Sequence, residues 1–318
     1  MLTLDNVYRA ANVLLGVVQK TNLIYAPRLK SGAEIYLKTE NLQSTGSFKI
    51  RGAYFKMSGL TPEEREKGVI ACSAGNHAQG VALAARKNKI KAVICLPKNA
   101  PISKIEATKS FGAEVCLVDG VYDDAYKKAV SLRDEYGLTF VHPFDDESVI
   151  SGQGTIALEI LDQLPDVNAI IVPIGGGGLI SGIAFTVKSI KPSVKVFGVE
   201  AEGAASMLTS LNKCAITELQ TVSTIADGIA VKKPGRITYG LCSRFVDDIV
   251  TVSDEEIYAA ILALVEQNKL VAEGAGAASV AAAMFGKIDL RREKTVCLVS
   301  GGNIDPLTLA QIIQKNNK

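Results

Sequence analysis

The sequence has few of the residues on which many catalytic sites depend. Its 318 residues include no tryptophan and only two histidines, His77 and His142. A catalytic triad built on histidine therefore has few candidate bases, and no Gly-x-Ser-x-Gly nucleophile elbow occurs. Acid pairs at 123–124, 145–146 and 247–248 have no histidine or cysteine at ligand spacing. We therefore expect no metal site.

Charge, cysteine content and hydropathy exclude further classes of protein. The 35 basic and 33 acidic residues leave a net charge of +2, which provides no electrostatic basis for binding nucleic acid or an anionic membrane. The six cysteines form no Cys-x-x-Cys pair, and several lie in apolar runs, as in a reduced, cytoplasmic protein. No apolar run approaches the roughly 18 residues of a membrane span. The first 20 residues fit an amphipathic helix, not a signal peptide.

Short runs rich in β-branched residues alternate with longer segments of helical period along most of the chain. The runs are apolar on both faces, as in parallel strands that helices cover on both sides. The alternation therefore predicts an α/β fold with a mostly parallel sheet. We expect strands at 69–72, 92–96, 114–118, 169–174, 194–200, 247–252 and 295–300, and helices at 76–88, 102–111, 122–136, 153–164, 178–190, 254–268, 274–286 and 305–315.

Local signals refine this pattern. Thr61 with Glu64, and Ser253 with Glu256, form capping boxes that mark two helix starts. Residues 142–154 break the alternation with proline, acids and glycines. We therefore expect the chain to cross between two lobes there.

The segment GQGTIA at 152–157 matches the Gly-x-Gly-x-x-Ala form of a dinucleotide-binding fingerprint. That fingerprint follows a strand directly and precedes an acid by about 20 residues. Here a poor strand pattern precedes it, and the acid-free IVPIGGGG lies about 20 residues further on. We therefore interpret these glycines as a tight helix start and not as a site for NAD(P).

A run of four glycines, Gly175 to Gly178, lies between a buried-strand pattern and a helical pattern in IVPIGGGGLISG (171–182). Without side chains, several backbone N–H groups at a helix N-terminus are open to an anion. No Gly-Lys-Ser/Thr follows, so this is not a nucleoside-triphosphate loop. A merely flexible loop would lose conformational entropy on folding without gain. The run therefore predicts a site for one compact phosphate monoester.

Two more strand ends carry polar residues. Ser73, Asn76 and His77 lie at a predicted helix start in CSAGNHAQGVALAA, where they either cap the helix or help to bind a carboxylate. The segment VCLVSGGNID (296–305) ends another strand with Ser-Gly-Gly-Asn, either as a simple turn or as part of a site. Ligands gather at the carboxyl ends of parallel strands, so these ends, together with the glycine run, point to one site.

Lys49 is the last candidate, and it lies between Phe48 and Ile50 in STGSFKIRGA (44–53). It is either a surface lysine whose stem covers apolar neighbours or an amine held out of water as a nucleophile for a carbonyl. Pyridoxal 5′-phosphate requires both such a lysine and a separate phosphate site. The combination of Lys49 with the glycine run therefore predicts this cofactor.

The chain resembles the fold-type II pyridoxal-phosphate enzymes and, within them, the catabolic threonine dehydratases, or threonine ammonia-lyases. The resemblance covers nearly the whole chain and rests on ENLQSTGSFKIRGA, ACSAGNHAQGVA, SGQGTIALEI, VPIGGGGLISGIA, TIADGIAVKKPG, VDDIV, VAEGAGA and VSGGNID. It implies a two-lobed fold like that of the tryptophan synthase β chain, each lobe a mostly parallel sheet covered by helices. It also implies a large cofactor-binding domain of residues 1–45 and 146–318, a small mobile domain of residues 46–145, and no C-terminal regulatory domain.

The resemblance also implies roles for single residues. Lys49 would be the Schiff-base lysine and the base at the substrate Cα, and Phe48 would pack against the cofactor ring. Asn76 would bond the phenolic oxygen of the cofactor, and Ser300 would face its pyridine nitrogen. Two groups complete the site: Ser73, Asn76 and His77 at the substrate carboxylate, and the backbone amides of Gly175, Gly176, Gly177, Gly178 and Leu179 at the phosphate.

The activity that the resemblance implies is β-elimination, in which L-threonine yields 2-oxobutanoate and ammonia, and L-serine yields pyruvate. It further implies a cytoplasmic homodimer or homotetramer, with AMP or CMP as a candidate effector.

Other members of the same fold remain alternatives. Serine racemases and hydroxyaspartate ammonia-lyases share most of these motifs, but racemases carry a serine where this chain has Ala74. Their metal motif Glu-x3-Ala-x-Asp reads here Glu200, Ala204 and Ser206, which leaves one carboxylate for a divalent cation. A non-catalytic nucleotide sensor is the remaining alternative, and it would have no use for Lys49.

Overall fold

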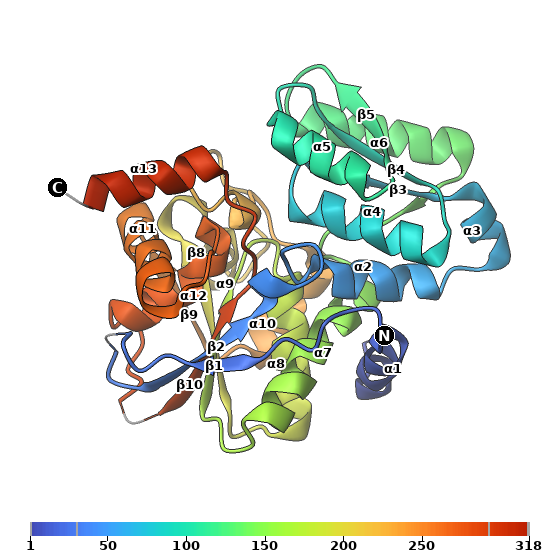
Figure 1. Ribbon diagram of the computed structural model, residues 1–318. Helices are drawn as coiled ribbons and strands as arrows, with labels where there is room; N and C mark the ends of the chain where they lie inside the picture. Colours follow the sequence, from blue (N-terminus) through green and yellow to red (C-terminus); the bar gives the residue numbers. More distant parts are fainter. Residues whose placement is uncertain (1, 30, 292, 317–318) are drawn as a thin grey trace.

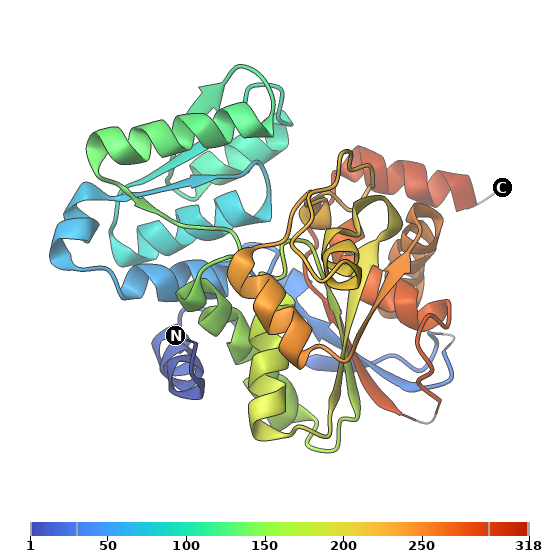
Figure 2. The same ribbon diagram turned by 180° about the vertical axis from the view of Figure 1, so that it is seen from behind.

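The computed structural model describes residues 2–29, 31–291 and 293–316, and the chain forms two lobes, each built on its own sheet (Figure 1 and Figure 2). The larger sheet has the strand order β1-β2-β10-β7-β8-β9. The pair β1–β2 is antiparallel, and the other pairs are parallel. Its strands are Leu23–Tyr25 (β1), Glu34–Thr39 (β2), Ala169–Pro173 (β7), Lys195–Ala201 (β8), Asp248–Val252 (β9) and Lys294–Val299 (β10).

The smaller sheet has four parallel strands in the order β5-β4-β3-β6. All four lie between β2 and β7 in the sequence, so the chain leaves the first lobe, builds the second and returns. The expected α/β fold with two parallel-rich sheets is therefore confirmed, whereas the domain boundaries stay a prediction. The strands are Val69–Cys72 (β3), Ala92–Pro97 (β4), Glu114–Val118 (β5) and Thr139–Phe140 (β6).

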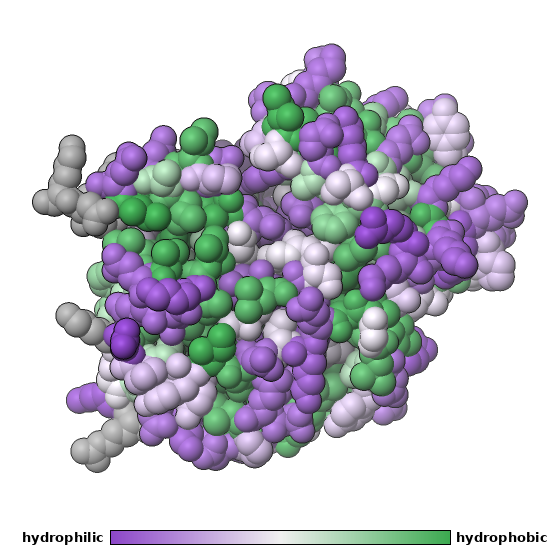
Figure 3. Space-filling view, in the orientation of Figure 1, coloured by the Kyte–Doolittle hydropathy of each residue, from purple (hydrophilic) through white to green (hydrophobic). Residues whose placement is uncertain are grey.

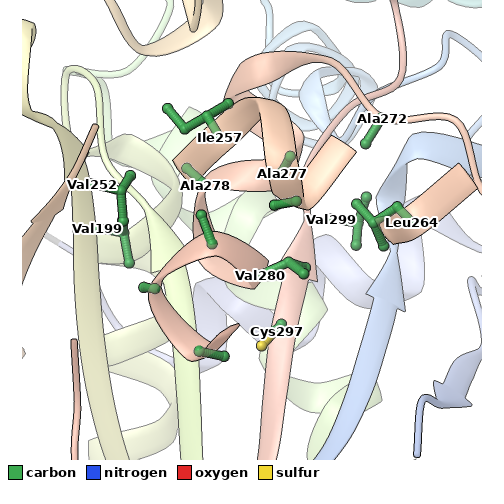
Figure 4. Packing of buried hydrophobic residues seen from close by; sticks show 14 of the residues in the cluster. Val199, Val252, Ile257, Leu264, Ala272, Ala277, Ala278, Val280, Cys297 and Val299 are labelled. Atoms are coloured by element: carbon green, nitrogen blue, oxygen red, sulfur yellow. The ribbon is translucent and has the colours of Figure 1, made fainter. Parts of the chain in front are cut away.

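Helices cover both faces of each sheet, because successive side chains of a strand point to opposite sides. In β10, Cys297 and Val299 belong to the cluster under α12, while Val296 and Leu298 belong to the cluster that contains α8. Figure 4 shows α12 lying over the strands in the first cluster. The α-helices are Leu4–Leu14 (α1), Lys49–Ser58 (α2), Pro62–Lys67 (α3), Asn76–Asn88 (α4), Ile102–Ser110 (α5), Tyr122–Tyr136 (α6), Glu147–Gln163 (α7), Gly178–Ile190 (α8), Ser206–Asn212 (α9), Arg236–Phe245 (α10), Asp254–Ala263 (α11), Gly274–Met284 (α12) and Pro306–Asn316 (α13).

Four single-turn helices complete the description, and most predicted elements are present. All predicted strands are confirmed, with ends within one residue of the expected positions. Both capping boxes are formed, at the starts of α3 and α11. The sequence patterns did not indicate β1, β2, β6, α2, α9 or α10. The single-turn helices are Glu40–Leu42 (η1), Glu202–Ala204 (η2), Asp227–Ile229 (η3) and the π-helix Leu264–Asn268 (η4).

The interpretation of GQGTIA as a helix start is wrong. Both of its glycines lie inside α7, which begins at Glu147 and not at the expected residue 153. Asp146 starts this helix earlier, because its carboxylate accepts hydrogen bonds from two N–H groups of the first turn. The glycines serve close packing instead. A Cβ on Gly152 would lie only 2.6 Å from the Cα of Gly52, so α7 and α2 touch backbone to backbone.

Two further features of the described residues are the surface and the cysteines. Within the described residues, no helix combines the length and the apolar character needed to cross a bilayer. Figure 3 shows hydrophilic and hydrophobic residues interspersed over this face of both lobes. All six cysteines are free, and four of them are buried in the core. Of the other two, Cys116 is half-buried and Cys214 is exposed.

Candidate active site

Lys49 is the first residue of α2, the helix that Figure 1 shows beside the junction of the two lobes. Its backbone packs against α4, where a Cβ on Gly80 would lie 3.0 Å from the Lys49 Cβ. Its Nζ donates a hydrogen bond to the carbonyl oxygen of Pro143 at 2.9 Å. Burial lowers the pKa of Lys49 to about 8, and the carboxylate of Glu273 opposes this shift. These observations support the interpretation of Lys49 as an amine held out of water, and not as a surface lysine.

The end of β10 meets the residues just before Lys49. The backbone N–H of Phe48 donates to the carbonyl oxygen of Ser300 at 3.2 Å, and Ser47 forms a bridge with Gly301. The Ser300 hydroxyl is buried and lies 3.4 Å from the carbonyl oxygen of Ala275. The strand end SGGN is therefore part of the same site as STGSFK, and not a separate turn.

The glycine run forms the turn between β7 and α8, as predicted. Gly177 has a φ of 93°, in the left-handed region that glycine adopts without strain, and precedes the first turn of α8. The first N–H groups of α8, from Gly178 onward, have no acceptor within the helix. They are available to an anion, and the helix dipole favours negative charge there.

Phe144 connects the glycine run to Lys49. A side chain on Gly176 would overlap the Phe144 ring, and a Cβ on Gly178 would lie 2.8 Å from the Phe144 Cα. Pro143, the preceding residue, accepts the hydrogen bond from Lys49. The structure therefore brings the amine and the glycine run to the same segment of chain. Leu179 shares one apolar cluster with Phe48, on the same side of the larger sheet.

Asn76 starts α4 and is held at both ends of its side chain. Its Nδ2 donates to Glu273 Oε1 at 2.5 Å, and its Oδ1 accepts from Asn303 Nδ2 at 2.7 Å. Burial raises the pKa of Glu273 to about 7, with a further rise from Asp227, whereas the hydrogen bond from Asn76 lowers it. The Asn76 side chain is thus a connection between the lobes and not a helix cap.

Ser73 and His77 flank Asn76, but their side chains have local partners. The Ser73 hydroxyl accepts from the N–H of Gly75 at 3.1 Å, within the turn that leads into α4. The His77 ring is buried, with Nε2 2.8 Å from the carbonyl oxygen of Val141. Burial, together with the nearby charge of Lys49, lowers the pKa of His77 to about 3, so the ring is neutral. Their predicted contacts with a carboxylate stay predictions.

Sequence reasoning missed three residues of this site and one contact across it. Glu273 and Asn303 lie in quoted motifs but received no role, and Phe144 was not considered. Lys104 of α5 forms an ion pair of 2.5 Å with Asp227 of η3, which joins the two lobes beside Glu273. No local signal marks these residues, because each acts through partners far away in the sequence.

Glu200, the remaining acid of the racemase-like metal motif, has another use in this chain. Its carboxylate accepts hydrogen bonds from the N–H groups of Met207 and Leu208, at 2.9 and 2.8 Å, and so caps α9. Burial raises the pKa of Glu200 to about 7. Among the described residues, no group of three or more histidine, cysteine or acidic side chains is arranged to hold a metal ion.

The residues present fit pyridoxal 5′-phosphate. The amine of Lys49, with its low pKa, suits an aldehyde, and the open N–H groups before and within α8 suit a phosphate. Ser300 and Asn76 supply further polar groups, just after the ends of β10 and β3. Each feature lies at the carboxyl end of a parallel strand or in the helix beside it.

Comparison with known proteins agrees with this site. Residues 14–302 match the family described as "Pyridoxal-phosphate dependent enzyme". The chain is 51% identical over 317 residues to the L-threonine ammonia-lyase of Thermotoga maritima, covering 99% of this chain and 79% of that protein. It is 46% identical over 317 residues to the catabolic L-threonine dehydratase TdcB of Escherichia coli K12, covering 98% and 96%.

Solved structures show the same likeness. Threonine deaminase isoform 2 from Solanum lycopersicum, in its processed form, has a TM-score of 0.91 and 40% identity, covering 98% of this chain and 93% of that one. Maize serine racemase has a TM-score of 0.94 and 36% identity, covering 99% and 98%. The chain described here belongs to the family of pyridoxal-phosphate dependent enzymes.

Proposed function

We propose that this protein is a threonine ammonia-lyase, which converts L-threonine into 2-oxobutanoate and ammonia and also converts L-serine into pyruvate. The observation that carries the proposal is the half-buried Lys49, whose pKa is lowered to about 8, so that a far larger share of its amine is neutral near physiological pH than in an ordinary lysine. The names of the two relatives from Thermotoga maritima and Escherichia coli support the choice of substrate.

When bound, pyridoxal 5′-phosphate supplies an aldehyde for the substrate amine and a ring that accepts negative charge from the substrate Cα. The backbone amides of Gly175 to Gly178 and Leu179 would hold its phosphate, and Phe48 would pack against its ring. The neutral amine of Lys49 removes the proton from Cα. Ser300 bears a hydroxyl, which cannot form an ion pair that keeps a ring nitrogen protonated. The weaker electron sink favours loss of the β-hydroxyl over transamination.

The substrate carboxylate would lie at the start of α4. There the backbone N–H groups of Asn76 and His77 have no acceptor within the helix, and the positive end of the helix dipole favours an anion. The His77 ring contributes no charge to this contact, because it is neutral and faces Val141. Ser73 would contribute through the turn that it stabilises before Asn76.

Serine racemization is the competing activity, and Ala74 argues against it. A racemase must return a proton to Cα from the face opposite Lys49. Ala74 follows Ser73 at the end of β3, and its methyl group has no proton to give. The oligomeric state, the AMP or CMP effector and the cytoplasmic location belong to the proposal as predictions from the resemblance.

Product analysis tests the proposed function. The loaded protein is incubated separately with L-threonine, L-serine, D-serine and 3-hydroxyaspartate, and 2-oxo acid, ammonia and enantiomer content are measured. We expect 2-oxobutanoate from L-threonine, and loss of this activity and of the visible absorption band in Lys49→Ala. A protein that stays colourless with the cofactor, or that yields only D-serine from L-serine, would contradict the proposal.

A further inference from the structure

We propose that Asn303 is a positioning residue that fixes which end of the Asn76 amide faces the ligand. The proposal rests on the proposed function, because it concerns the group that would contact the cofactor. Four residues form a chain of hydrogen bonds across the site. Asn303 Nδ2 donates to the carbonyl oxygen of Thr45 at 2.8 Å and to Asn76 Oδ1 at 2.7 Å. Asn76 Nδ2 then donates to Glu273 Oε1 at 2.5 Å.

The carbonyl oxygen of Thr45, at one end of this series of hydrogen bonds, determines which group donates in each of them. A backbone carbonyl oxygen can only accept, so Asn303 must turn its NH₂ group toward Thr45. The same NH₂ group contacts Asn76, so Asn76 must present its oxygen there. The two ends of an amide have nearly the same shape, and partners alone decide its orientation. Thr45 therefore determines, through Asn303, that the NH₂ group of Asn76 points to the other side.

Glu273, at the other end of this series of hydrogen bonds, agrees with this orientation of the Asn76 amide. A carboxyl oxygen that carries no proton can only accept, and Glu273 Oε1 takes one of the two N–H groups of Asn76. The oxygen of Asn76 is already engaged with Asn303, so Asn76 can offer a ligand a donor and not an acceptor. This suits an anionic oxygen such as the phenolic oxygen of the cofactor, whose deprotonated form a donor stabilises.

The backbone makes room for Asn303 at one particular glycine. Gly46 has a φ of 68°, and a Cβ there would overlap the Oδ1 of Asn303. The N–H of Gly302 donates to the Gly46 carbonyl oxygen at 2.9 Å, which holds the two loops together. The glycine of STGSFK therefore admits the side chain that orients Asn76, and the same loop leads directly into Lys49.

Asn303→Asp is the test, because aspartate has the same shape but can only accept. It cannot donate to Thr45, and it draws the NH₂ group of Asn76 toward itself, which turns the Asn76 oxygen toward the ligand. The readouts are the affinity for pyridoxal 5′-phosphate and the pH titration of the visible band of the loaded protein. We expect affinity to fall about tenfold or more, and the titration midpoint to rise by about one pH unit, since loss of the donor disfavours the deprotonated form.

Asn303→Ala separates orientation from simple packing. Alanine removes more atoms than aspartate, so a purely structural role would make alanine the more damaging change. An orienting role makes aspartate worse, because alanine leaves Asn76 free to keep its orientation. Thermal unfolding of the apoproteins shows whether both variants fold. If Asn303→Asp does not fold, Asn303→Ser takes its place, and its single donor should leave the midpoint between wild type and Asn303→Ala.

Asn41→Asp is the matched control. Asn41 is also buried, it lies beside Gly302, and its amide donates to the carbonyl oxygen of Val271 at 2.9 Å, which is not one of the groups that orient Asn76. We expect it to lower stability without moving the titration midpoint. An unchanged midpoint in Asn303→Asp, a larger shift in Asn303→Ala, or an equal shift in Asn41→Asp would each overturn the inference. Wild-type protein without a Lys49-dependent band would instead overturn the proposed function.

Discussion

Lys49 and Arg51 lie two positions apart in the first turn of α2, and both carry a basic group into the interior with opposite results. The Arg51 guanidinium is 1% exposed and bonds twice to Glu40, at 2.8 Å, and twice to Glu159, at 2.6 and 3.0 Å. Burial alone would lower the pKa of Arg51, but Glu40 and Glu159 more than reverse this shift. The amine of Lys49 has a backbone carbonyl as its hydrogen-bond partner, and its pKa falls to about 8.

The difference separates a cation that fixes structure from a cation that can react. A guanidinium held by two carboxylates keeps its charge and its position. An amine taken out of water without a bonded carboxylate loses its proton more easily and becomes a base and a nucleophile. Lys49 and Arg51 belong to the same turn of α2. The ion pairs of Arg51 therefore also hold the backbone of Lys49 in place.

Lys49→Ala is the substitution with the largest expected effect. We expect kcat for L-threonine to fall by at least about 10⁴-fold, because the variant loses both its base and its link to the cofactor. The free energy of unfolding should change by under about 2 kcal/mol, since the lost hydrogen bond is offset by relief from burying an amine. Initial rates and urea unfolding of the apoprotein give the two numbers. A large loss of stability would mean that Lys49 is structural, like Arg51.

Arg51→Met should show the opposite pattern in stability. Removing one partner of a buried ion pair leaves carboxylates without compensation and destabilises a protein by about 3–5 kcal/mol. Urea unfolding of the apoprotein measures this loss. Arg133→Met is the control, because Arg133 pairs with Asp134 on the exposed surface, where such a pair contributes at most about 1 kcal/mol. Equal losses of unfolding free energy in the two variants would show that the buried ion pairs of Arg51 stabilise the protein no more than an exposed pair does.

Most of the longer regular elements and the glycine run were predictable because their signals are local. A strand such as β7 is apolar along its whole length and ends directly in Gly175 to Gly178. The start of α7 was missed because Gly152 weakens a helical pattern, and its reason is contact with Gly52 of another helix. β1 and β6 have three and two residues, too few for a period to be visible.

The polar connections of the site were not predictable, because they join distant parts of the chain. Asn76 and Asn303 are 227 positions apart, and nothing near either residue indicates the other. Arg51 resembles a surface residue in the sequence, and only the approach of Glu159, 108 positions away, makes its burial favourable. Lys49 could be proposed from its neighbours and the glycine run, but its low pKa depends on the packing of both lobes.

Glu273→Gln sharpens the comparison by removing the charge that opposes the shift of Lys49. Without this carboxylate the pKa of Lys49 should fall further below 8, so more of the amine is neutral at pH 7. The apoprotein should then react about two- to threefold faster with an aldehyde such as pyridoxal at pH 7, with the gain vanishing above pH 9. Borohydride reduction and peptide mapping at Lys49 measure this rate. Glu256→Gln, which removes a carboxylate paired with Lys287, should leave it unchanged.

Lys104→Met has the smallest expected effect, and it tests a third cation, which is neither held in a buried cluster like Arg51 nor as deeply buried. Lys104 pairs with Asp227 across the two lobes, with 24% and 60% of the two side chains exposed. Exposed pairs contribute at most about 1 kcal/mol, so kcat/KM for L-threonine should fall less than about fivefold. The loss should disappear at high salt, which screens exposed charges.

Lys98→Met is the matched control for Lys104, because Lys98 pairs with Asp119 and both residues directly follow strands of the smaller sheet. It should not change kcat/KM. A tenfold or larger loss in Lys104→Met that persists at high salt would contradict the expectation, because screening removes the contribution of an exposed pair. Lys104 would then resemble Arg51, as a cation that holds the reacting groups in place. The distinction between structural and reactive cations would in that case not follow burial alone.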